Sequence, residues 1–458
     1  MLLVSIDTLR ADHLGFYGYE RFTSPVLDTL AIEGVVFEDV SSTASWTLPS
    51  HVSMLTGLFP REHGASSYSS GLPEGVPTLA GMLSGAGWDT AAVVNVEWLK
   101  RESFFATRDF GQYLWAPASL SRRTANSWVT DQALEWIEAM GDAPLFVFAH
   151  YYDLHSDYAA EDAYERLFVS PYEGPFTGSG SQLKLQAIPD GYLDACRKDF
   201  DPDRCKFGDV LVLDDSAQKL EMGPADVKRL EELYDSQIRQ LDSELARLFT
   251  ALRRSGLLEQ TLLIITSDHG EEFMERGGVE HSYTAYQEVV RVPLLIRGPD
   301  MPAGLRVAAP VSLVDLAPTI LAQTGIDSDA PMQGLDLSPL WKDGDDSAFR
   351  ERHLFIEAPG GASQNVLAGE WFPVWYGVRQ GRYKLVYEQL SESHALYDLL
   401  EDPGEERDVS QGEPEMAGAL LDVLLARISG SEDGQVDGVE VQLDDEAIER
   451  LRALGYVP

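Results

Sequence analysis

The chain has 458 residues and a net charge of −40, from 75 acidic residues against 35 Lys and Arg. Its 44% of hydrophobic and 24% of charged residues are typical of a folded protein, long enough for a large domain and a smaller one. This acidic balance repels nucleic acid and anionic lipid, so we expect no nucleic-acid partner. An anionic substrate would need local positive charge, from a metal ion or a few cationic side chains.

Strand and helix patterns alternate through the first two thirds of the chain. Apolar residues recur every three or four positions over 227–254, which predicts an amphipathic helix. Alternation of this kind predicts an α/β domain over 1–335, with a mostly parallel sheet between helices and sites beyond the carboxyl ends of strands. Five continuous apolar runs are expected to form its buried parallel strands: 2–6, 90–94, 144–151, 261–267 and 292–297.

Two loop-rich stretches interrupt this pattern. Residues 156–225 are rich in Asp, Gly, Pro and Ser, and we interpret them as an insertion over the site. They contain Cys196 and Cys205, for which a disulfide and two unpaired thiols stay equally open. The second stretch, 327–350, precedes a tail over 350–458. Strand patterns at 353–358, 375–381 and 382–388 and a helix at 413–429 predict a small antiparallel sheet with one packed helix there.

The ends of the chain bear on where the protein works. No apolar run reaches membrane length, so we expect no stable membrane insertion. Met1 leads directly into the strand at 2–6 with no visible signal peptide, which suggests a truncated N-terminus. The location therefore stays open: export if a signal has been lost, and the cytoplasm otherwise.

Acidic residues follow two of the predicted strands. Asp7 comes directly after 2–6, and Asp268 and His269 come directly after 261–267. A single Asp at a strand end more often caps a helix than binds a metal. Two such acids with an adjacent His are better explained by a shared divalent cation, because carboxylate and imidazole groups are common ligands.

A third segment, SWTLPSHVSMLTG at 45–57, predicts a helix. Pro49 suits the first turn of this helix, and Gly57 is expected to end the helix. Thr47 is expected just before the helix N-terminus, where free N–H groups favour an anion. Taken alone, Thr47 would be an ordinary helix cap. Beside a metal, its hydroxyl would suit a nucleophile.

Several segments, in order, resemble the sulfatase family of the alkaline phosphatase superfamily over essentially the whole chain. They are SIDTLRADHLGFYGY, TLPSHVSMLTGLFPREHG, HYYDLHSDY, TSDHGEEFMERGGVEH with RVPLLIRGP, and the tail segments GRYKLVYE, ALYDLLEDPGEERD and LRALGYV. The resemblance implies an alkaline phosphatase-like α/β fold and a metal-dependent ester hydrolase. It also implies that Asp7, Asp268 and His269 hold the metal and that Thr47 shares it.

The resemblance implies roles for His155 and His281, and position in the predicted helix and strand suggests roles for His51 and Asn95. His155 aligns with the family histidine that contacts the ester oxygens, and His281 lies where relatives place a Lys or His near the leaving group. His281 is thus the candidate general acid. His51, one helical turn beyond Thr47, would orient or deprotonate its hydroxyl. Asn95, at the end of the strand 90–94, would donate to the substrate. Glu271 and Glu272 are expected to be solvated or in the first turn of a helix.

The chain also departs from the family pattern. Sulfatases convert a Cys or Ser at the position of Thr47 to formylglycine, and an Arg stands at the position of His51. Oxidation of a Thr gives only a ketone, so that modification is not expected, and Thr resembles the phosphoryl-transferring relatives. Thr8 replaces the second Asp of the family pair, and His269 stands where many sulfatases have Asn. These changes shift the expected metal from calcium, the family default, towards zinc or manganese.

Three functions remain open at this stage. The first is a hydrolase that cleaves a sulfate or phosphate ester, carried on a small molecule, glycan or lipid, by in-line attack of Thr47. The second is a phosphodiesterase, phosphonate hydrolase or phosphoryl transferase on the same scaffold. The third is a catalytically inactive anion-binding protein, which the retained candidate residues disfavour.

Overall fold

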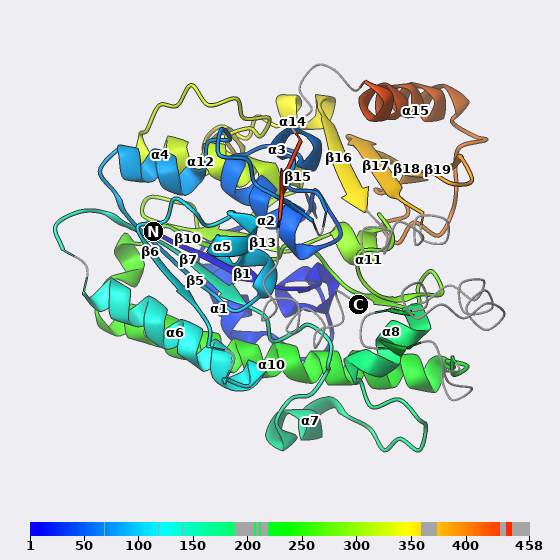
Figure 1. Ribbon diagram of the computed structural model, residues 1–458, viewed down its shortest axis with the longest axis horizontal. Coiled ribbons are helices and arrows are strands. Elements are labelled where there is room, and N and C mark those ends of the chain that lie inside the picture. The colour runs from blue at the N-terminus through cyan, green and yellow to red at the C-terminus, as the bar shows by residue number, and fades with distance from the viewer. Residues whose placement is uncertain are drawn as a thin grey trace.

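The computed structural model describes residues 1–67, 69–117, 119–139, 141–187, 206–207, 210–211, 219–358, 373–430 and 437–441. Cys196, Cys205 and the closing LRALGYV segment lie outside these ranges. In Figure 1 a large sheet lies between two groups of helices, with a smaller sheet and its helix at the upper right. This is the expected α/β architecture, a large sheet between helices with a small antiparallel sheet near the C-terminus.

The large sheet has eight strands in the order β14-β2-β13-β10-β1-β7-β5-β6. The parallel pairing of β1 with β7 and β10, and of β7 with β5, confirms four of the five predicted strands. The outer strands β14, β2 and β6 are short and were not predicted. The strands span Leu305–Val307 (β14), Val35–Phe37 (β2), Leu294–Arg297 (β13), Leu263–Thr266 (β10), Leu2–Ile6 (β1), Leu145–Tyr151 (β7), Asp89–Val94 (β5) and Gln112–Trp115 (β6).

The strand predicted at 292–297 was expected to be parallel, and this was wrong. β13 pairs antiparallel with both β10 and β2. After β10 the chain forms the hairpin of β11 (Glu272–Phe273) and β12 (Val279–Glu280) and the short helix α11 (Gln287–Val290). A parallel strand would have required a crossover back to the opposite edge. Since the chain instead re-enters from the edge where β10 ends, β13 runs in the opposite direction.

Each face of the large sheet carries its own core, because alternate strand residues point to opposite faces. One face, with Leu2 and Val4, packs against α10 (Pro224–Arg254), the predicted long helix, and against α6 (Arg122–Glu138). The other face, with Leu3 and Phe148, packs against α2 (Thr47–Thr56), α4 (Leu79–Gly85) and α12 (Leu316–Thr324). Figure 1 shows these two helix layers below and above the sheet.

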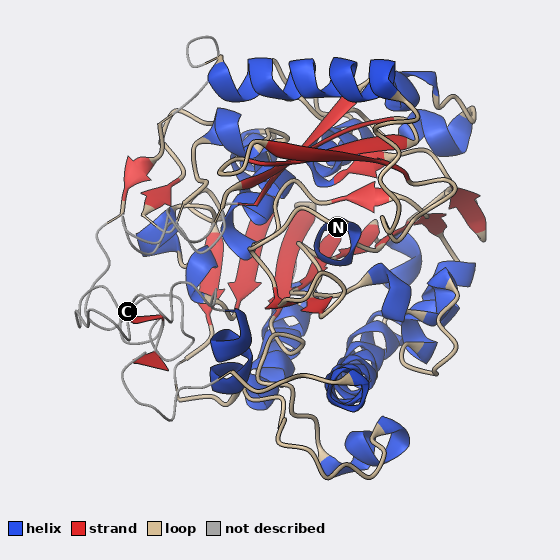
Figure 2. Ribbon diagram, turned by 90° about the vertical axis from the view of Figure 1, so that its right-hand side faces the viewer, coloured by secondary structure: helices blue, strands red, loops and turns tan. Residues whose placement is uncertain are grey.

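The tail forms the predicted antiparallel sheet, in the order β16-β17-β18-β19. Its strands are His353–Ala358, Trp375–Gln380, Tyr383–Glu388 and Ser393–Asp398, and α15 (Pro414–Ser429) packs on one face (Figure 2). The stretch 327–350, expected to be a loop, contains the short helices α13 (Ser338–Lys342) and α14 (Ser347–Glu351). In the 156–225 segment, the described elements are α7 (Asp162–Phe168), α8 (Gly180–Ala187), β8 (Lys206–Phe207) and β9 (Val210–Leu211).

The small sheet is tied to the large domain through Glu405, which also forms a buried ion pair within the tail. The Lys384 ammonium on β18 lies 2.8 Å from the Glu405 carboxylate, and both side chains are fully buried. Glu405 also accepts a 2.7 Å hydrogen bond from the backbone N–H of Gln287, in α11. Apolar residues of both parts share one core, among them Val289, Val290, Ile356 and Val386.

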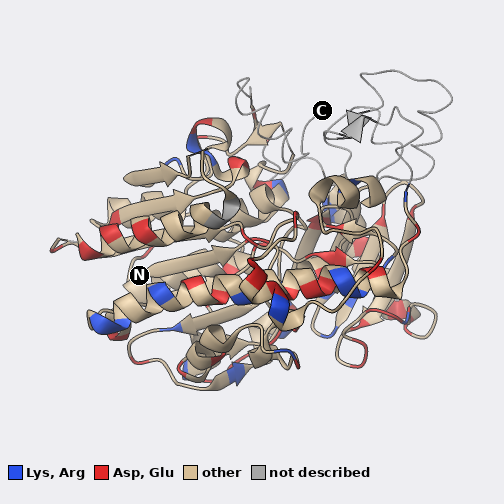
Figure 3. Ribbon diagram, turned by 90° about the horizontal axis from the view of Figure 1, so that it is seen from below, with Lys and Arg blue, Asp and Glu red and all other residues tan. Residues whose placement is uncertain are grey.

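Acidic side chains are spread over the helices seen from below, α10 among them (Figure 3). No helix among the described residues is both long and apolar enough to cross a bilayer.

We predict that Lys384→Met lowers the free energy of unfolding by about 3–5 kcal/mol, because it leaves the Glu405 carboxylate buried without its cation. Chemical denaturation measures the loss. The control Lys228→Met removes an ammonium whose side chain is 57% exposed and should change stability by about 0.5 kcal/mol or less. A loss for Lys384→Met as small as that of the control would contradict the structural role of the pair.

Candidate metal centre and active site

Three adjacent strands bring polar side chains to one edge of the large sheet. Ser5 of β1 lies opposite His150 of β7, and β10 ends beside β1 at Thr266. Ser5 and His150 lie on strands at positions that alternate with apolar residues facing α10, so both point towards α2. Asp7 and Asp268 follow two residues beyond Ser5 and Thr266, on the same side. The sheet thus gathers two acids and an imidazole beneath the N-terminus of α2.

The gathered groups lie at close range and are almost fully buried. The His150 Nε2 atom is 3.3 Å from an Asp7 oxygen, and the His269 Nε2 atom is 3.3 Å from an Asp268 oxygen and 3.8 Å from Asp7. The Thr47 hydroxyl lies 3.5 Å from Asp7 Oδ2 and 3.4 Å from His269 Nε2. One ligand atom each from Asp7, Asp268 and His269 falls within 4.8 Å of the others. Neighbouring ligands of one bound cation lie about 3–3.5 Å apart, so these spacings fit a divalent metal.

The hydrogen bonds around Asp268 and His269 leave one atom of each turned to the shared space. Asp268 Oδ1 accepts the backbone N–H groups of Thr8 and His269, whereas Oδ2 has no hydrogen-bond donor among the described residues. His269 Nδ1 donates to the Gly270 carbonyl at 3.0 Å, so Nε2 carries the lone pair. Burial, with the neighbouring Asp7 charge, raises the pKa of Asp268 to about 6, and burial lowers the pKa of His269 to about 4. A cation here would offset the cost of burying the ionised Asp268 carboxylate and would bind the neutral His269 imidazole.

Helix α2 presents Thr47 to this group of residues. It begins at Thr47 rather than after it, with Trp46 as N-cap and Pro49 in the first turn, and ends at Gly57, whose φ of 73° suits a glycine. The hydroxyl of Thr47 faces Asp7 and His269, as the nucleophile interpretation requires, and makes none of the described cap hydrogen bonds. The free N–H groups of the first turn favour an anionic group beside it.

His51 lies on the same face of α2 as Thr47, yet its ring is not placed to deprotonate that hydroxyl. Its Nδ1 donates to the Thr47 backbone carbonyl at 2.8 Å, and its Nε2 accepts from the Ser5 hydroxyl at 2.8 Å. Burial lowers the pKa of His51 to about 4, which keeps the ring neutral. With both nitrogens engaged, His51 holds the first turn of α2. Of the two roles expected for His51, to orient or to deprotonate the Thr47 hydroxyl, this geometry favours orientation.

His155 and His281 lie together next to His269. The ring centroid of His281 is 4.4 Å from that of His269 and 4.8 Å from that of His155. His281 Nδ1 shares a 2.9 Å hydrogen bond with Glu271 Oε1, and both residues are buried. Glu280 and Ser282, on either side of His281, have positive φ angles of 70° and 78°, which non-glycine residues rarely adopt. The hairpin thus holds His281 in a strained, defined position.

Two findings correct the expected roles of Asn95 and Glu271. The Asn95 amide bonds His150 at one end and Asn126 at the other, so it supports His150 and is not aimed at a substrate. Glu271, expected to be solvated, is fully buried against His281, and Glu272 is buried as well. The sequence interpretation also missed His150. The available signal was a histidine inside an otherwise apolar strand, where an uncompensated polar group is costly.

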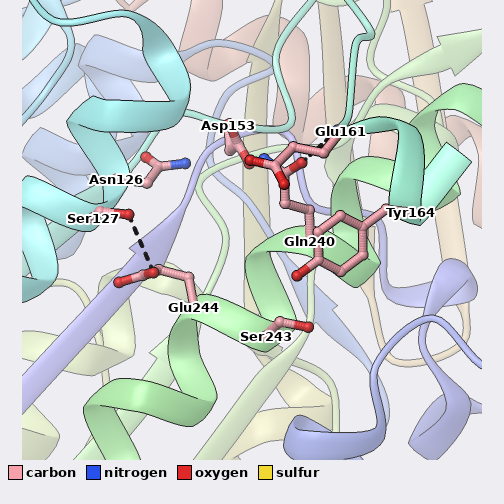
Figure 4. Close-up of a pocket in the computed structure, with 8 residues that line it drawn as sticks. All are labelled: Asn126, Ser127, Asp153, Glu161, Tyr164, Gln240, Ser243 and Glu244. Carbon is pink, nitrogen blue, oxygen red and sulfur yellow. Dashed lines mark hydrogen bonds between the residues drawn. The ribbon is translucent and has the colours of Figure 1, made fainter.

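A separate polar cavity of about 150 Å³ lies beside Asn126, between α6 and α10. Figure 4 shows Asn126 and Ser127 on one side of it and Gln240 and Glu244 of α10 on the other. Ser127 donates to Glu244 at 3.2 Å across it. None of the metal-facing residues lines this cavity, so it is distinct from the candidate active site.

Comparisons with known proteins now bear on this site. Residues 1–326 match the family model described as Sulfatase. The chain belongs to the sulfatase family. Residues 279–428 of this sulfatase-family chain also match the model described as N-sulphoglucosamine sulphohydrolase, C-terminal. The family resemblance of the sequence motifs is thereby confirmed.

Two curated relatives of this sulfatase-family member are arylsulfatases. Arylsulfatase K of Bos taurus is 31% identical over 210 residues, which cover 44% of this chain and only 37% of that protein. Arylsulfatase A of Homo sapiens is 26% identical over 492 residues, covering 93% of this chain and 85% of that protein. The arylsulfatase K match therefore spans well under two thirds of that relative.

Two solved structures share the fold of this sulfatase-family chain. One, determined with its substrate D-glucosamine-2-N,6-O-disulfate, has a TM-score of 0.73 at 19% identity and covers 94% of this chain and 98% of its own. The other, the phosphonate monoester hydrolase of Agrobacterium radiobacter, has a TM-score of 0.69 at 19% identity, with coverage of 96% and 99%. At such identities the likeness establishes the fold alone.

We predict that a divalent metal raises the melting temperature of the metal-free protein, by an amount equivalent to about 2.7 kcal/mol when free metal is 100 times its Kd. Asp268→Asn should abolish this shift, whereas Asp336→Asn, remote from the metal-facing residues, should keep it. Because Asp268→Asn removes the repulsion between the two buried carboxylates, its metal-free form should be at least as stable as the wild type. Calorimetry in chelator and in added metal tests this, and a full metal-induced shift in Asp268→Asn would refute the assignment.

Proposed function

We propose that this chain is a metal-dependent ester hydrolase that transfers a sulfuryl or phosphoryl group to Thr47 and then to water. The observation that carries the proposal is the position of the Thr47 hydroxyl. It faces Asp7 and His269 at the start of α2 instead of capping that helix. Family membership supports ester hydrolysis, because the sulfatase model covers most of the chain.

The metal would be held by Asp7, Asp268 and His269, with Thr47 as a further ligand. When bound, it lowers the pKa of the Thr47 hydroxyl and offsets negative charge on the transferring group. The mixture of carboxylate oxygen and imidazole nitrogen favours zinc or manganese over calcium, the default of the family. The N–H groups of the first turn of α2 add further donors for the anionic ester.

In the first step, the Thr47 oxygen attacks the sulfur or phosphorus atom in line with the leaving oxygen. The bond to Thr47 forms as the ester bond breaks, and Asp7 Oδ2 is the acceptor that faces the Thr47 proton. His155, whose ring stacks on Tyr152 and lies beside His281, would contact the ester oxygens. This positioning makes the attack effectively unimolecular.

His281 supplies the proton that the leaving oxygen needs. Burial raises the pKa of Glu271 to about 8 and lowers that of His281 to about 4, so the pair retains two protons at neutral pH. One proton lies between Glu271 Oε1 and His281 Nδ1, and the other is on His281 Nε2. The pair therefore presents an Nε2–H donor whichever partner formally carries the charge.

In the second step, water attacks the sulfur or phosphorus atom, the bond to the Thr47 oxygen breaks, and that oxygen takes back the proton held by Asp7 Oδ2. His281, now without its Nε2 proton, accepts one proton from that water. A threonyl phosphate hydrolyses in this way without difficulty. A threonyl sulfate is harder to clear, because Thr lacks the carbonyl-forming elimination that releases sulfate from formylglycine.

The second candidate function is a phosphodiesterase, a phosphonate hydrolase or a phosphoryl transferase on the same scaffold. It is favoured by Thr47 itself, since a hydroxyl nucleophile suits phosphorus chemistry in both steps. The ester would be carried on a small molecule, a glycan or a lipid, and one solved relative was determined with a disulfated glucosamine. The charge of −40 argues against a nucleic-acid substrate.

One experiment separates these functions from the third, an inactive anion-binding protein. Metal-free protein is supplied with zinc, manganese or calcium and assayed on p-nitrophenyl sulfate and on bis-p-nitrophenyl phosphate. We expect turnover with zinc or manganese and little without metal. Turnover of the sulfate alone supports a sulfatase, and turnover of the diester alone supports the second candidate. The absence of turnover with every metal and both esters would refute hydrolysis.

We predict that Thr47→Ala lowers kcat by at least about 10³-fold with unchanged metal content, while Thr47→Ser retains partial activity, because its hydroxyl can still attack. Thr56→Ala, at the other end of α2, removes a hydroxyl that bonds the Val52 carbonyl and should keep near-normal turnover. Folded, metal-loaded Thr47→Ala with most of its activity would instead identify water as the nucleophile.

We predict that His281→Gln lowers kcat by about 10²–10⁴-fold on an alkyl ester and much less on a p-nitrophenyl ester. The nitrophenolate leaves without a proton, whereas an alkoxide does not. His394→Gln, at an exposed histidine of β19, should affect neither substrate. Equal losses on both esters would show that His281 is not the general acid.

A further inference from the structure

His150 is a buried imidazole for which the sequence motifs provide no role. It lies on β7, on the face of the sheet that carries α2, and its side chain has no exposed surface. Its Nε2 atom is 3.3 Å from an Asp7 carboxylate oxygen and has no hydrogen-bond partner among the described residues. It also contributes a ligand atom within 4.8 Å of one from Asp268 and one from His51.

In the structure, two amides are oriented so that Nδ1 of His150 carries its proton. Asn126 Oδ1 accepts from Asn95 Nδ2 at 2.9 Å, which turns the Asn95 carbonyl oxygen towards His150. That oxygen can only accept, so His150 Nδ1 is the donor in their 3.0 Å hydrogen bond. The lone pair of His150 is therefore on Nε2, directed at the carboxylate side of the site. A lone pair facing a carboxylate oxygen at 3.3 Å is unfavourable unless a cation lies within reach of both.

His51 does not share this arrangement, although its ring centroid lies 4.9 Å from that of His150. Both nitrogens of His51 are already engaged, by the Thr47 carbonyl and the Ser5 hydroxyl. Binding of a cation by His51 would break one of these bonds in a fully buried setting. Of the two histidines, His150 is the one with a nitrogen available.

We propose that His150 is a ligand of the same cation as Asp7, Asp268 and His269, and that Asn95 and Asn126 are its positioning residues. An imidazole that binds a metal through one nitrogen and donates its other N–H to a fixed acceptor is a recurring arrangement in metalloproteins. The proposal rests on the metal dependence in the proposed function and extends it. It gives the site two imidazoles, and Thr8 in place of a second acid gives it one carboxylate fewer than the family pattern. This ligand set selects zinc-class ions against calcium.

The first test counts coordinated imidazoles by X-ray absorption at the zinc edge, on the whole protein loaded with one equivalent of zinc. We expect two imidazoles in the wild type and one in His150→Ala. The control His394→Gln, which removes an exposed histidine of β19, should keep two. One imidazole in the wild type, or an unchanged count in His150→Ala, would overturn the proposal. One imidazole in the wild type would leave His150 as a hydrogen-bond donor to Asp7.

The second test examines the positioning residue by zinc titration calorimetry. Asn95→Leu removes the acceptor behind His150 and should weaken zinc binding by about 10–100-fold. Asn95→Asp keeps an acceptor and should bind zinc at least as tightly as the wild type. Gln380→Leu, which removes an amide on β17 of the small sheet, should leave the affinity unchanged. Equal affinities for Asn95→Leu and Asn95→Asp would overturn the positioning role.

These measurements separate this proposal from the proposed function. Zinc bound through two imidazoles by a protein that turns over no ester refutes the hydrolase and retains the His150 ligand. Ester turnover by a protein whose zinc is bound by a single imidazole would support the hydrolase and overturn the His150 ligand.

Discussion

The structure is organised around the electrostatic cost of holding two carboxylates, Asp7 and Asp268, close together away from water. Neither side chain has exposed surface, and like charges in such a setting strongly disfavour one another unless a cation compensates them. The surrounding chain holds them there regardless. The Asp268 carbonyl accepts hydroxyl hydrogen bonds from Ser42 at 2.5 Å and Ser50 at 2.6 Å, which join β3 (Val40–Ser41), α2 and the loop after β10. The fold thus maintains a site that is complete only with a positive charge.

The chemistry that such a site supports depends on the group that faces the cation. In formylglycine enzymes the sulfated intermediate resolves by forming a carbonyl, and a threonine has no equivalent route. In the proposed mechanism, release from Thr47 would therefore come from attack at sulfur or phosphorus by water. The difference between the two esters would then lie in this second step more than in the first. Leaving-group assistance by His281, as proposed with Glu271 as its partner, would serve both esters equally.

The sequence predicted most of the features that depend on which residues are buried. It predicted few of those that depend on the direction of a strand or the orientation of a side chain. Apolar runs located β1, β5, β7 and β10, and acids at strand ends located Asp7 and Asp268. The same runs could not show that β13 is antiparallel, because burial on both faces looks alike in either direction. His150 was hidden within the apolar pattern of β7. Glu271 was assigned to solvent because its burial depends on packing between distant segments, and the ring orientation of His51 is a matter of rotamer, which spacing does not specify.

The small sheet has a bearing on the site that its separate position in the chain conceals. The edge strand β16 bridges Ala44, three residues before Thr47. Glu405, the buried partner of Lys384, accepts a hydrogen bond from the N–H of Gln287, six residues after His281. The segment before Thr47 and the segment after His281 are therefore both bonded to the tail. In the terms of protein evolution, the tail is not an exchangeable module. A recombination that replaced it would have to replace the contacts of α2 and α11 as well, so the segments that carry Thr47 and His281 are expected to be inherited together with the tail.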